Sequence, residues 1–247
     1  MVRPIYDKTV TVLGRQGLER NINGTDRILI SPESRGLGEA YEEACWKSLM
    51  KEVREGDTVL DIGAFIGLYT IAFASRVGPT GRVIAFEPDP DNYRLLLEHL
   101  RLNGVAERVE AIHAAAGETV TIVQLSRDGS QTHVSTQGQD ATVECKTVDS
   151  VIRDAKIDVV KMDVEGYEEH VVRGATKLLS DPQRKPRLMY IEVHPYAWPN
   201  HGTSDRSLLS LLRSFGYAAE DLNGESVERI DRYGEVVCRL SEGREHS

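Results

Sequence analysis

Two short acidic segments in this chain combine residue types and spacing that could carry proton-transfer chemistry. Asp163 and Glu165 follow one predicted strand, and Glu192 and His194 end another. Because side chains at positions i and i+2 of a strand point to the same side, each pair would face one space. If the two strands are neighbours, all four side chains converge. The ordinary pKa of histidine, about 6.5, suits a general base at neutral pH. We therefore take His194 as the candidate base, with Glu192 or Glu165 to orient it.

The same carboxylates raise the alternative of a divalent metal site. Asp163, Glu165 and Glu192 would offer oxygen ligands, which favour magnesium or calcium, and such an ion would lower the pKa of a bound hydroxyl. Neither the spacing nor the ligand count requires a cation, so we predict no metal ligand. His194 also has a simpler interpretation, as a strand-end residue before a proline with no chemical role.

A second group of candidate residues surrounds a glycine turn. The segment D-I-G-A-F-I-G runs from Asp61 to Gly67, at the end of an apolar run rich in β-branched residues that predicts a buried strand. Glycine at positions 63 and 67 permits positive φ and close approach of a ligand. Segment 68–76 predicts a helix. The turn would therefore aim backbone N–H groups and the positive end of this helix at a ligand.

A candidate ribose ligand follows the next predicted strand, 82–86. Glu87 stands 87 − 61 = 26 residues after Asp61. In nucleotide-binding α/β folds, an acid at the end of the second strand accepts hydrogen bonds from ribose hydroxyls. A carboxylate can accept two O–H donors at once. The alternative is a solvated glutamate that caps the following helix.

The elements that must position these residues alternate between strands and helices. This alternation predicts an α/β fold with ligands at the carboxyl ends of the strands. Core strands are predicted at 58–62, 82–86, 108–113, 157–162, 186–193, 217–222 and 235–240, with two more strands in the N-terminal part at 8–13 and 27–30. Helices are predicted at 38–53, 68–76, 89–103, 167–179 and 203–215. Two exposed strands, 119–125 and 142–146, flank a Gln-rich loop, 126–140, which we expect to be a flexible substrate flap.

Composition narrows the class of protein. The 247 residues include 40% hydrophobic residues, and 30 basic against 39 acidic residues give a net charge of −9. This excess of acidic residues argues against nucleic acid as a partner. The absence of an apolar run of about 18 residues argues against a membrane span. Three scattered cysteines and no apparent signal peptide indicate a cytoplasmic protein. We expect an N-terminal extension with a lid helix (1–55), a main domain (56–241) and a tail (242–247).

Five sequence blocks, taken in order, resemble one known family. Asp61-x-Gly63-x-Phe65-x-Gly67 is similar to the first motif of class I S-adenosylmethionine (SAM) methyltransferases. Together with I-A-F-E-P-D-P-D-N-Y, T-V-D-S-V, I-D-V-V-K-M-D-V-E-G-Y-E and I-E-V-H-P, it resembles the FkbM family of SAM-dependent methyltransferases over about 41–195. D-V-E-G-Y-E is the most specific block. Phe65 departs from the family, which usually has asparagine there.

The resemblance implies a Rossmann-like class I methyltransferase fold with a seven-stranded, mostly parallel sheet and helices on both faces. It implies SAM as cofactor and O-methylation of a hydroxyl on a sugar or polyketide-type molecule in natural product biosynthesis. The glycine loop would hold the methionine part of SAM, and Glu87 its ribose. Small residues after strand 108–113 would suit a flat adenine ring. The candidate cofactor-binding residues are Asp61, Gly63, Ala64, Phe65, Gly67, Tyr69, Glu87, Pro88, Tyr93, Ala114, Ala115 and Asp163.

Two competing classes remain open from sequence. An NAD-dependent oxidoreductase could use the same turn, although the fingerprint G-x-G-x-x-G is absent after the Asp61 strand. A non-catalytic SAM-binding module could keep the fold, with Phe65 as the altered position. The acceptor, the methylated atom and the oligomeric state are not determined by these patterns.

Overall fold

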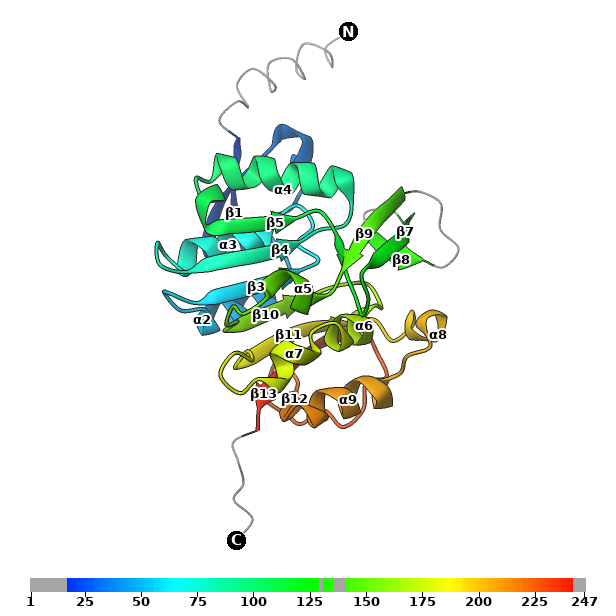
Figure 1. The fold of residues 1–247 in the computed structure, drawn as a ribbon. Helices are drawn as coiled ribbons and strands as arrows, with labels where there is room; N and C mark the ends of the chain where they lie inside the picture. The colour runs from blue at the N-terminus through cyan, green and yellow to red at the C-terminus, as the bar shows by residue number, and fades with distance from the viewer. Residues whose placement is uncertain (1–16, 129–130, 136–140, 242–247) are drawn as a thin grey trace.

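The protein is built around one seven-stranded sheet. The computed structural model describes residues 17–128, 131–135 and 141–241 (Figure 1). The strand order of the sheet is β12-β13-β11-β10-β3-β4-β5. β13 is antiparallel to both its neighbours and the other pairs are parallel, which confirms the predicted, mostly parallel sheet. The strands are β3 (Thr58–Ile62), β4 (Arg82–Phe86), β5 (Val109–Ile112), β10 (Val159–Met162), β11 (Leu188–Val193), β12 (Tyr217–Glu220) and β13 (Gly234–Leu240).

The central strands are apolar because both faces of the sheet are covered. Every residue of β10 and β11 is buried, as expected of parallel strands with helices on both sides. Side chains alternate between two cores, so that Val59 packs into one core and Leu60 into the other. The predicted strand at 8–13 lies outside the described residues.

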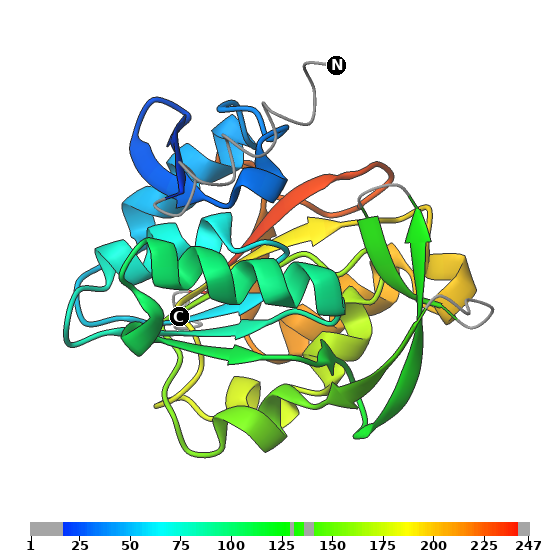
Figure 2. The ribbon, with the colours of Figure 1, turned by 90° about the horizontal axis from the view of Figure 1, so that it is seen from above.

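Helices form a layer on each face of the sheet. Figure 2 shows the blue N-terminal hairpin and α4 on one side, with yellow-green helices on the other. No described helix combines the length and apolar character needed to cross a membrane. One layer contains α2 (Glu43–Glu52), α3 (Leu68–Arg76) and α4 (Pro90–Leu102). The other contains α5 (Val148–Ile152), α6 (Glu168–Arg173), α7 (Thr176–Ser180), α8 (Trp198–His201) and α9 (Asp205–Ser214).

The N-terminal region is a hairpin followed by a helix. β1 (Leu18–Ile22) and β2 (Asp26–Ile30) pair antiparallel, and Leu29 exchanges hydrogen bonds with the side chain of Asn103 at the end of α4. The hairpin therefore packs against the helix layer. Helix α2 begins at residue 43, not at the predicted residue 38. The reason is that the Asn23 side chain binds both backbone groups of Tyr41, which removes them from a helical ladder.

A four-stranded sheet, β6-β9-β7-β8, stands beside the carboxyl ends of the central strands (Figure 1). Its strands are β6 (Ala115–Ala116), β7 (Thr121–Asp128), β8 (Gln131–Ser135) and β9 (Ala141–Lys146). The predicted loop 126–140 was wrong in part, because β7 extends into it and β8 lies within it. These two strands pair antiparallel from Gln124↔Ser135 to Asp128↔Gln131, a cross-strand match that the Gln-rich composition did not indicate. Residues 129–130 and 136–140 lie outside the described part.

The predicted helix 167–179 is divided into α6 and α7. Gly174 stands between them, and a Cβ atom there would lie 1.9 Å from the carbonyl oxygen of Gly117. The carboxylate of Asp149 accepts hydrogen bonds from the backbone N–H groups of Lys177 and Leu178 at 2.8 and 3.0 Å. These contacts come from distant parts of the chain and start a new helix.

Candidate active site

A cavity of about 270 Å³ lies at the carboxyl ends of β3, β4, β10 and β11. This is the edge at which open α/β sheets bind ligands. The glycine turn and Glu87 line one part of it, and Asp163, Glu165 and Glu192 line another. The cavity therefore joins the two groups of candidate residues in one space.

The glycine turn is held by the strands beside it. The N–H groups of Gly63 and Ala64 donate to the carbonyl of Phe86 at 3.0 and 2.9 Å. Gly63 has φ +84°, and a Cβ atom there would lie 1.7 Å from the carbonyl oxygen of Asp163. Phe65 also has positive φ, 51°, a conformation that asparagine and glycine tolerate better than phenylalanine. This backbone explains why asparagine suits the position.

Glu87 is 3% exposed and joins the turn to the start of α4. Its carboxylate accepts hydrogen bonds from the N–H groups of Phe65 at 2.7 Å and Asp89 at 2.8 Å. Burial raises the pKa of Glu87 to about 8, against these two donors, which lower it. The helix cap is Asp89, which accepts from Asp91 and Asn92. Glu87 is thus a buried cavity residue and not a solvated cap.

The remaining cofactor candidates divide into two sets. Gly63, Phe65, Glu87, Pro88, Ala114, Ala115 and Asp163 line the cavity. Asp61, Ala64, Gly67, Tyr69 and Tyr93 are not among its lining residues. Asp61 is fully buried and accepts a hydrogen bond from Thr70 at 2.5 Å, while Tyr93 stacks on His113 with ring centroids 4.8 Å apart. These contacts hold Asp61 and Tyr93 against neighbouring elements.

The cavity fits the chemical groups of SAM. Ala114, Ala115 and Ala116 leave room for a flat ring, and Glu87 presents a carboxylate for ribose hydroxyls. Glu42 lines the same cavity, and its Oε2 atom is buried with no hydrogen-bond partner among the described residues. An unpaired carboxylate oxygen suits a positively charged group such as the ammonium of SAM.

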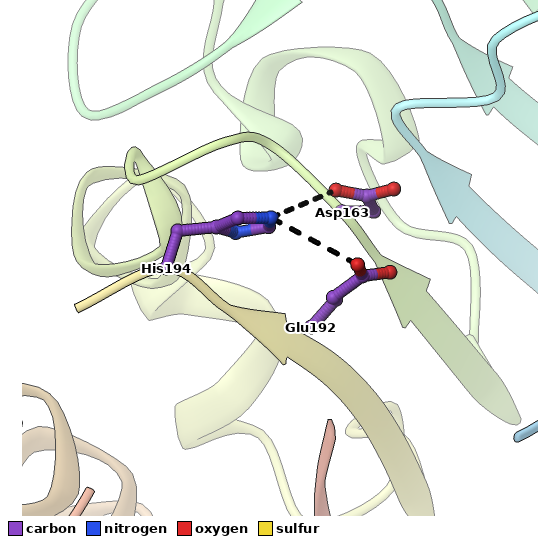
Figure 3. Close-up of side chains that lie close together, drawn as sticks. All are labelled: Asp163, Glu192 and His194. Carbon is purple, nitrogen blue, oxygen red and sulfur yellow. Dashed lines mark ion pairs between the residues drawn. The ribbon is translucent and has the colours of Figure 1, made fainter. Parts of the chain in front are cut away.

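The two acidic segments meet because β10 and β11 are parallel neighbours. Figure 3 shows the ring of His194 directed at Asp163 and Glu192. From His194 Nε2 the distances are 3.2 Å to Glu165, 3.8 Å to Asp163 and 3.9 Å to Glu192. The expectation of one converging cluster from neighbouring strands therefore agrees with the geometry. His194, however, is fully buried and does not line the cavity.

The carboxylate that orients His194 is Glu168. Oε1 of Glu168 lies 2.8 Å from His194 Nδ1 and also accepts from the N–H group of Gly166. Oε2 of Glu168 accepts from the indole N–H group of Trp198. Since Glu168 receives two other donors, Nδ1 carries the proton in this bond. Burial alone would lower the pKa of His194, but the bond to Glu168 and the nearby Asp163 raise it above its ordinary value. Glu165 and Glu192 lie on the Nε2 side, so they do not provide the orienting bond expected from sequence.

Two carboxyl groups of the cavity, Glu165 and Glu192, have raised pKa values. Burial and the charge of Asp163 raise the pKa of Glu192 to about 7. Burial also raises the pKa of Glu165, which accepts a hydrogen bond from Tyr196 at 3.2 Å. Tyr233 donates to Glu192. The crowding of negative charge at this end of the cavity is therefore considerable.

Sequence reasoning missed several residues of the site. Lys161 is 4% exposed, and its Nζ atom lies 3.4 Å from Asp163 and 4.9 Å from the ring centre of Tyr69. A lysine within the apolar strand V-V-K-M was a signal that could have found it. Glu168 is the last acid of the D-V-E-G-Y-E block. Tyr41, Glu42 and Tyr233 reach the cavity from distant segments that carry no motif.

The chain is similar to known methyltransferases. The hexuronic acid methyltransferase AglP of Haloferax volcanii is 27% identical over 62% of this chain and 62% of its own length. The methyltransferase sdnD of Sordaria araneosa is 26% identical over 47% of this chain and 59% of its own length. The chain thus spans about three-fifths of each relative.

A solved structure agrees on the fold. A crystal structure from Clostridium thermocellum, named as an rRNA methylase, superposes with a TM-score of 0.54 at 15% identity, covering 83% of this chain and 99% of that one. At this identity the likeness shows the fold alone.

The model of the methyltransferase FkbM domain matches residues 61–219, which include the turn, Glu87 and the acidic cluster. The chain therefore belongs to the FkbM family of SAM-dependent methyltransferases.

Proposed function

We propose that this protein is an O-methyltransferase that moves the methyl group of SAM to a hydroxyl of a sugar or polyketide-type small molecule. One observation carries the proposal. A single cavity is lined by Glu87 and the glycine turn in one part and by Glu165 and Glu192 in another. SAM bound at the turn would supply an electrophilic methyl group. The carboxylates would then face the acceptor.

The chemistry of the acceptor end favours a neutral, hydroxyl-rich molecule. Carboxylates accept hydrogen bonds from hydroxyl groups, whereas several carboxylates together repel an anion. The rings of Tyr196 and Tyr233 are 63% and 55% exposed beside Glu165 and Glu192. Exposed aromatic faces with a polar tip suit the apolar face of a sugar. The relative AglP is named for a hexuronic acid, an anionic sugar, so its name supports a sugar acceptor but not the neutral charge that the carboxylates favour.

The reaction needs one proton acceptor and accurate positioning. As the acceptor oxygen forms its bond to the methyl carbon, the bond from that carbon to sulfur breaks and its electrons stay on sulfur. The hydroxyl proton leaves to a base. Glu165 is our candidate base, because it lines the cavity while His194 lies behind it with Nε2 at 3.2 Å. His194, held by Glu168, then acts as a positioning residue.

The first test is cofactor choice followed by product analysis. S-adenosylhomocysteine should raise the melting temperature by mass action, and NAD should not. With methyl-labelled SAM and a panel of neutral sugars, uronic acids and glycosylated polyketides, NMR should locate the label on oxygen of a neutral acceptor. A shift with NAD alone, or label found on nitrogen, would contradict the proposal.

A variant pair tests the assignment of the base. Glu165→Gln should lower turnover by about 100-fold, the lower end of general-base contributions, with an unchanged thermal shift by S-adenosylhomocysteine. Glu118→Gln is the matched control, since Glu118 pairs with a histidine, His170, at 3.4 Å on the surface. Equal turnover in the two variants would rule out Glu165 as the base.

A further inference from the structure

Asp163, Glu192 and His194 surround a small space at the ends of β10 and β11 (Figure 3). One ligand atom from each residue lies within 4.8 Å of the others. Ligand atoms bound at about 2.0–2.2 Å to one ion stand roughly 3 to 4 Å apart. The distances of 3.8 and 3.9 Å from His194 Nε2 to Asp163 and Glu192 are in that range.

His194 provides an observation that does not depend on the acidic cluster. Its side chain is 0% exposed, and Nε2 has no hydrogen-bond partner among the described residues, its nearest carboxylate oxygen being Oε2 of Glu165 at 3.2 Å. The ring cannot turn to find one, because Nδ1 is bonded to Glu168 and Glu168 is bonded to Trp198. A buried imidazole nitrogen without a partner costs free energy and calls for a ligand. Its direction identifies the space beside Asp163 and Glu192.

The carboxylates are also arranged with oxygens left over. Lys161 lies 3.4 Å from Oδ2 of Asp163, while Oδ1 has no hydrogen-bond partner in the described part of the chain. Tyr233 donates to Oε1 of Glu192, and Oε2 is likewise without one. Oδ1 of Asp163 and Nε2 of His194 thus lie 3.8 Å apart with no donor between them, and Oε1 of Glu192, which accepts from Tyr233, lies 3.9 Å from Nε2. Such a space suits a cation that has no lone pairs of its own.

We propose that Asp163, Glu192 and His194 bind a divalent first-row transition-metal ion. One imidazole nitrogen and two carboxylate oxygens favour Mn²⁺, Fe²⁺ or Zn²⁺ over Mg²⁺ and Ca²⁺, which prefer oxygen alone. This ligand set differs from the oxygen-only set considered from sequence, because Glu165 is not part of it and His194 is. Three protein ligands leave coordination positions open.

The inference deepens the proposed function and rests on it only for the role of the ion. Asp163 and Glu192 line the cavity, so an open coordination position would face the acceptor. An oxygen bound there would lose its proton more easily. Glu165, which is not a ligand, stays available to accept that proton. The ion would also offset the negative charge of the cluster.

The test measures binding of Mn²⁺ itself, without SAM or acceptor. Protein stripped with EDTA and dialysed is titrated with Mn²⁺, and free Mn²⁺ is read by electron paramagnetic resonance alongside calorimetry. We expect one Mn²⁺ per chain, bound more tightly than Mg²⁺. His194→Gln and Glu192→Gln should each weaken Mn²⁺ binding by about 100-fold or more, since even residues that only support metal ligands change affinity by about 10–100-fold. Glu118→Gln, at the surface His170 pair, should bind as wild type.

The outcomes separate the metal from the methyl transfer. Wild-type protein that binds no stoichiometric Mn²⁺, or that binds Mg²⁺ as tightly, overturns the metal site. Unchanged Mn²⁺ affinity in the two ligand variants overturns it too. If His194→Gln does not fold, as judged by circular dichroism, the Mn²⁺ affinity of Glu192→Gln, on the cavity wall, decides whether the metal site exists. Stoichiometric Mn²⁺ binding with no methyl transfer to any acceptor supports the site and removes the proposed function.

Discussion

The two ends of the cavity differ in how their polar groups are satisfied. At the end that we propose to bind SAM, both oxygens of Glu87 accept backbone N–H groups, and the turn at Gly63 is bonded to the carbonyl of Phe86. At the end that we propose to bind the acceptor, Asp163 and Glu192 lie 3.8 and 3.9 Å from His194 Nε2, and each of the three residues has an atom without a hydrogen-bond partner among the described residues. Glu87 and the turn are thus satisfied as folded, while Glu42, which also lines the cavity, keeps one oxygen without a partner among the described residues. The second end has the character of a site that needs a ligand to complete it.

Binding and chemistry can be divided between the two ends of the cavity. A preformed cofactor end loses little conformational entropy when a ligand binds. At the proposed acceptor end, polar groups that the chemistry needs are left unpaired, and this lowers the stability of the fold. Changes at one end should therefore affect binding of S-adenosylhomocysteine, and changes at the other should affect turnover.

The largest expected effect is a loss of stability from a substitution at Gly63, where the turn meets the backbone of Asp163. In Gly63→Ala the new Cβ would lie 1.7 Å from the carbonyl of Asp163, at φ +84°. We expect the free energy of unfolding to fall by about 3 kcal/mol or more, from overpacking and left-handed strain. Urea denaturation measures the loss. Gly202→Ala is the control, because it shares a positive φ of +68° but meets nothing within 4 Å. Similar losses in both variants would show that contact with Asp163 does not matter.

The next effect should be confined to the acceptor end. Glu168→Gln keeps the size of the side chain but turns an amide donor toward the N–H groups of His194, Trp198 or Gly166. Loss of the oriented imidazole should lower turnover by roughly 10–100-fold, as for other supporting residues. The dissociation constant of S-adenosylhomocysteine, measured by calorimetry, should not change. A parallel loss of affinity would show that the two ends are coupled.

The cofactor end should respond to pH through Glu87. Its pKa is raised to about 8 by burial, with Asp89 as the nearest other acid. Ribose hydroxyls bind the ionised carboxylate better, so binding favours loss of the proton. Affinity for S-adenosylhomocysteine should therefore rise as pH increases from 6 toward 8, by up to about tenfold per unit, and then level off. In Glu87→Gln the affinity should be weaker by about 10-fold or more and independent of pH. A pH slope that survives in Glu87→Gln must come from another group.

The smallest effect should be at Phe65. Its φ of 51° is strained for phenylalanine, and Phe65→Asn should relieve about 1 kcal/mol of backbone strain. The same change removes apolar contact with the core around Leu96 and Ile66. We expect a net change in stability below about 1 kcal/mol, measured by urea denaturation, and a few-fold change in affinity for S-adenosylhomocysteine. A large loss of stability would mean that packing of Phe65 outweighs its strain.

Elements with strong local patterns were predicted closely, and the others depended on distant contacts. Strands 58–62 and 82–86 and helix 68–76 agree with β3, β4 and α3 in their bounds. The start of α2 was placed too early because Asn23 binds Tyr41. The break before α7 was missed because Asp149 caps it from 28 residues away. Local propensity cannot register either contact.

The sequence alone determined the glycine turn and Glu87, because these parts are close together in the chain. One strand, one glycine turn, one helix and the acid of the next strand place Gly63 and Glu87 with little choice of arrangement. Only the tertiary structure decided the acceptor end. Pairing of β10 with β11 brought Asp163 to Glu192, and Glu168 with Trp198 set the direction of the His194 ring. Which strands are neighbours, and how a buried side chain is turned, depend on contacts between distant residues that no local pattern contains.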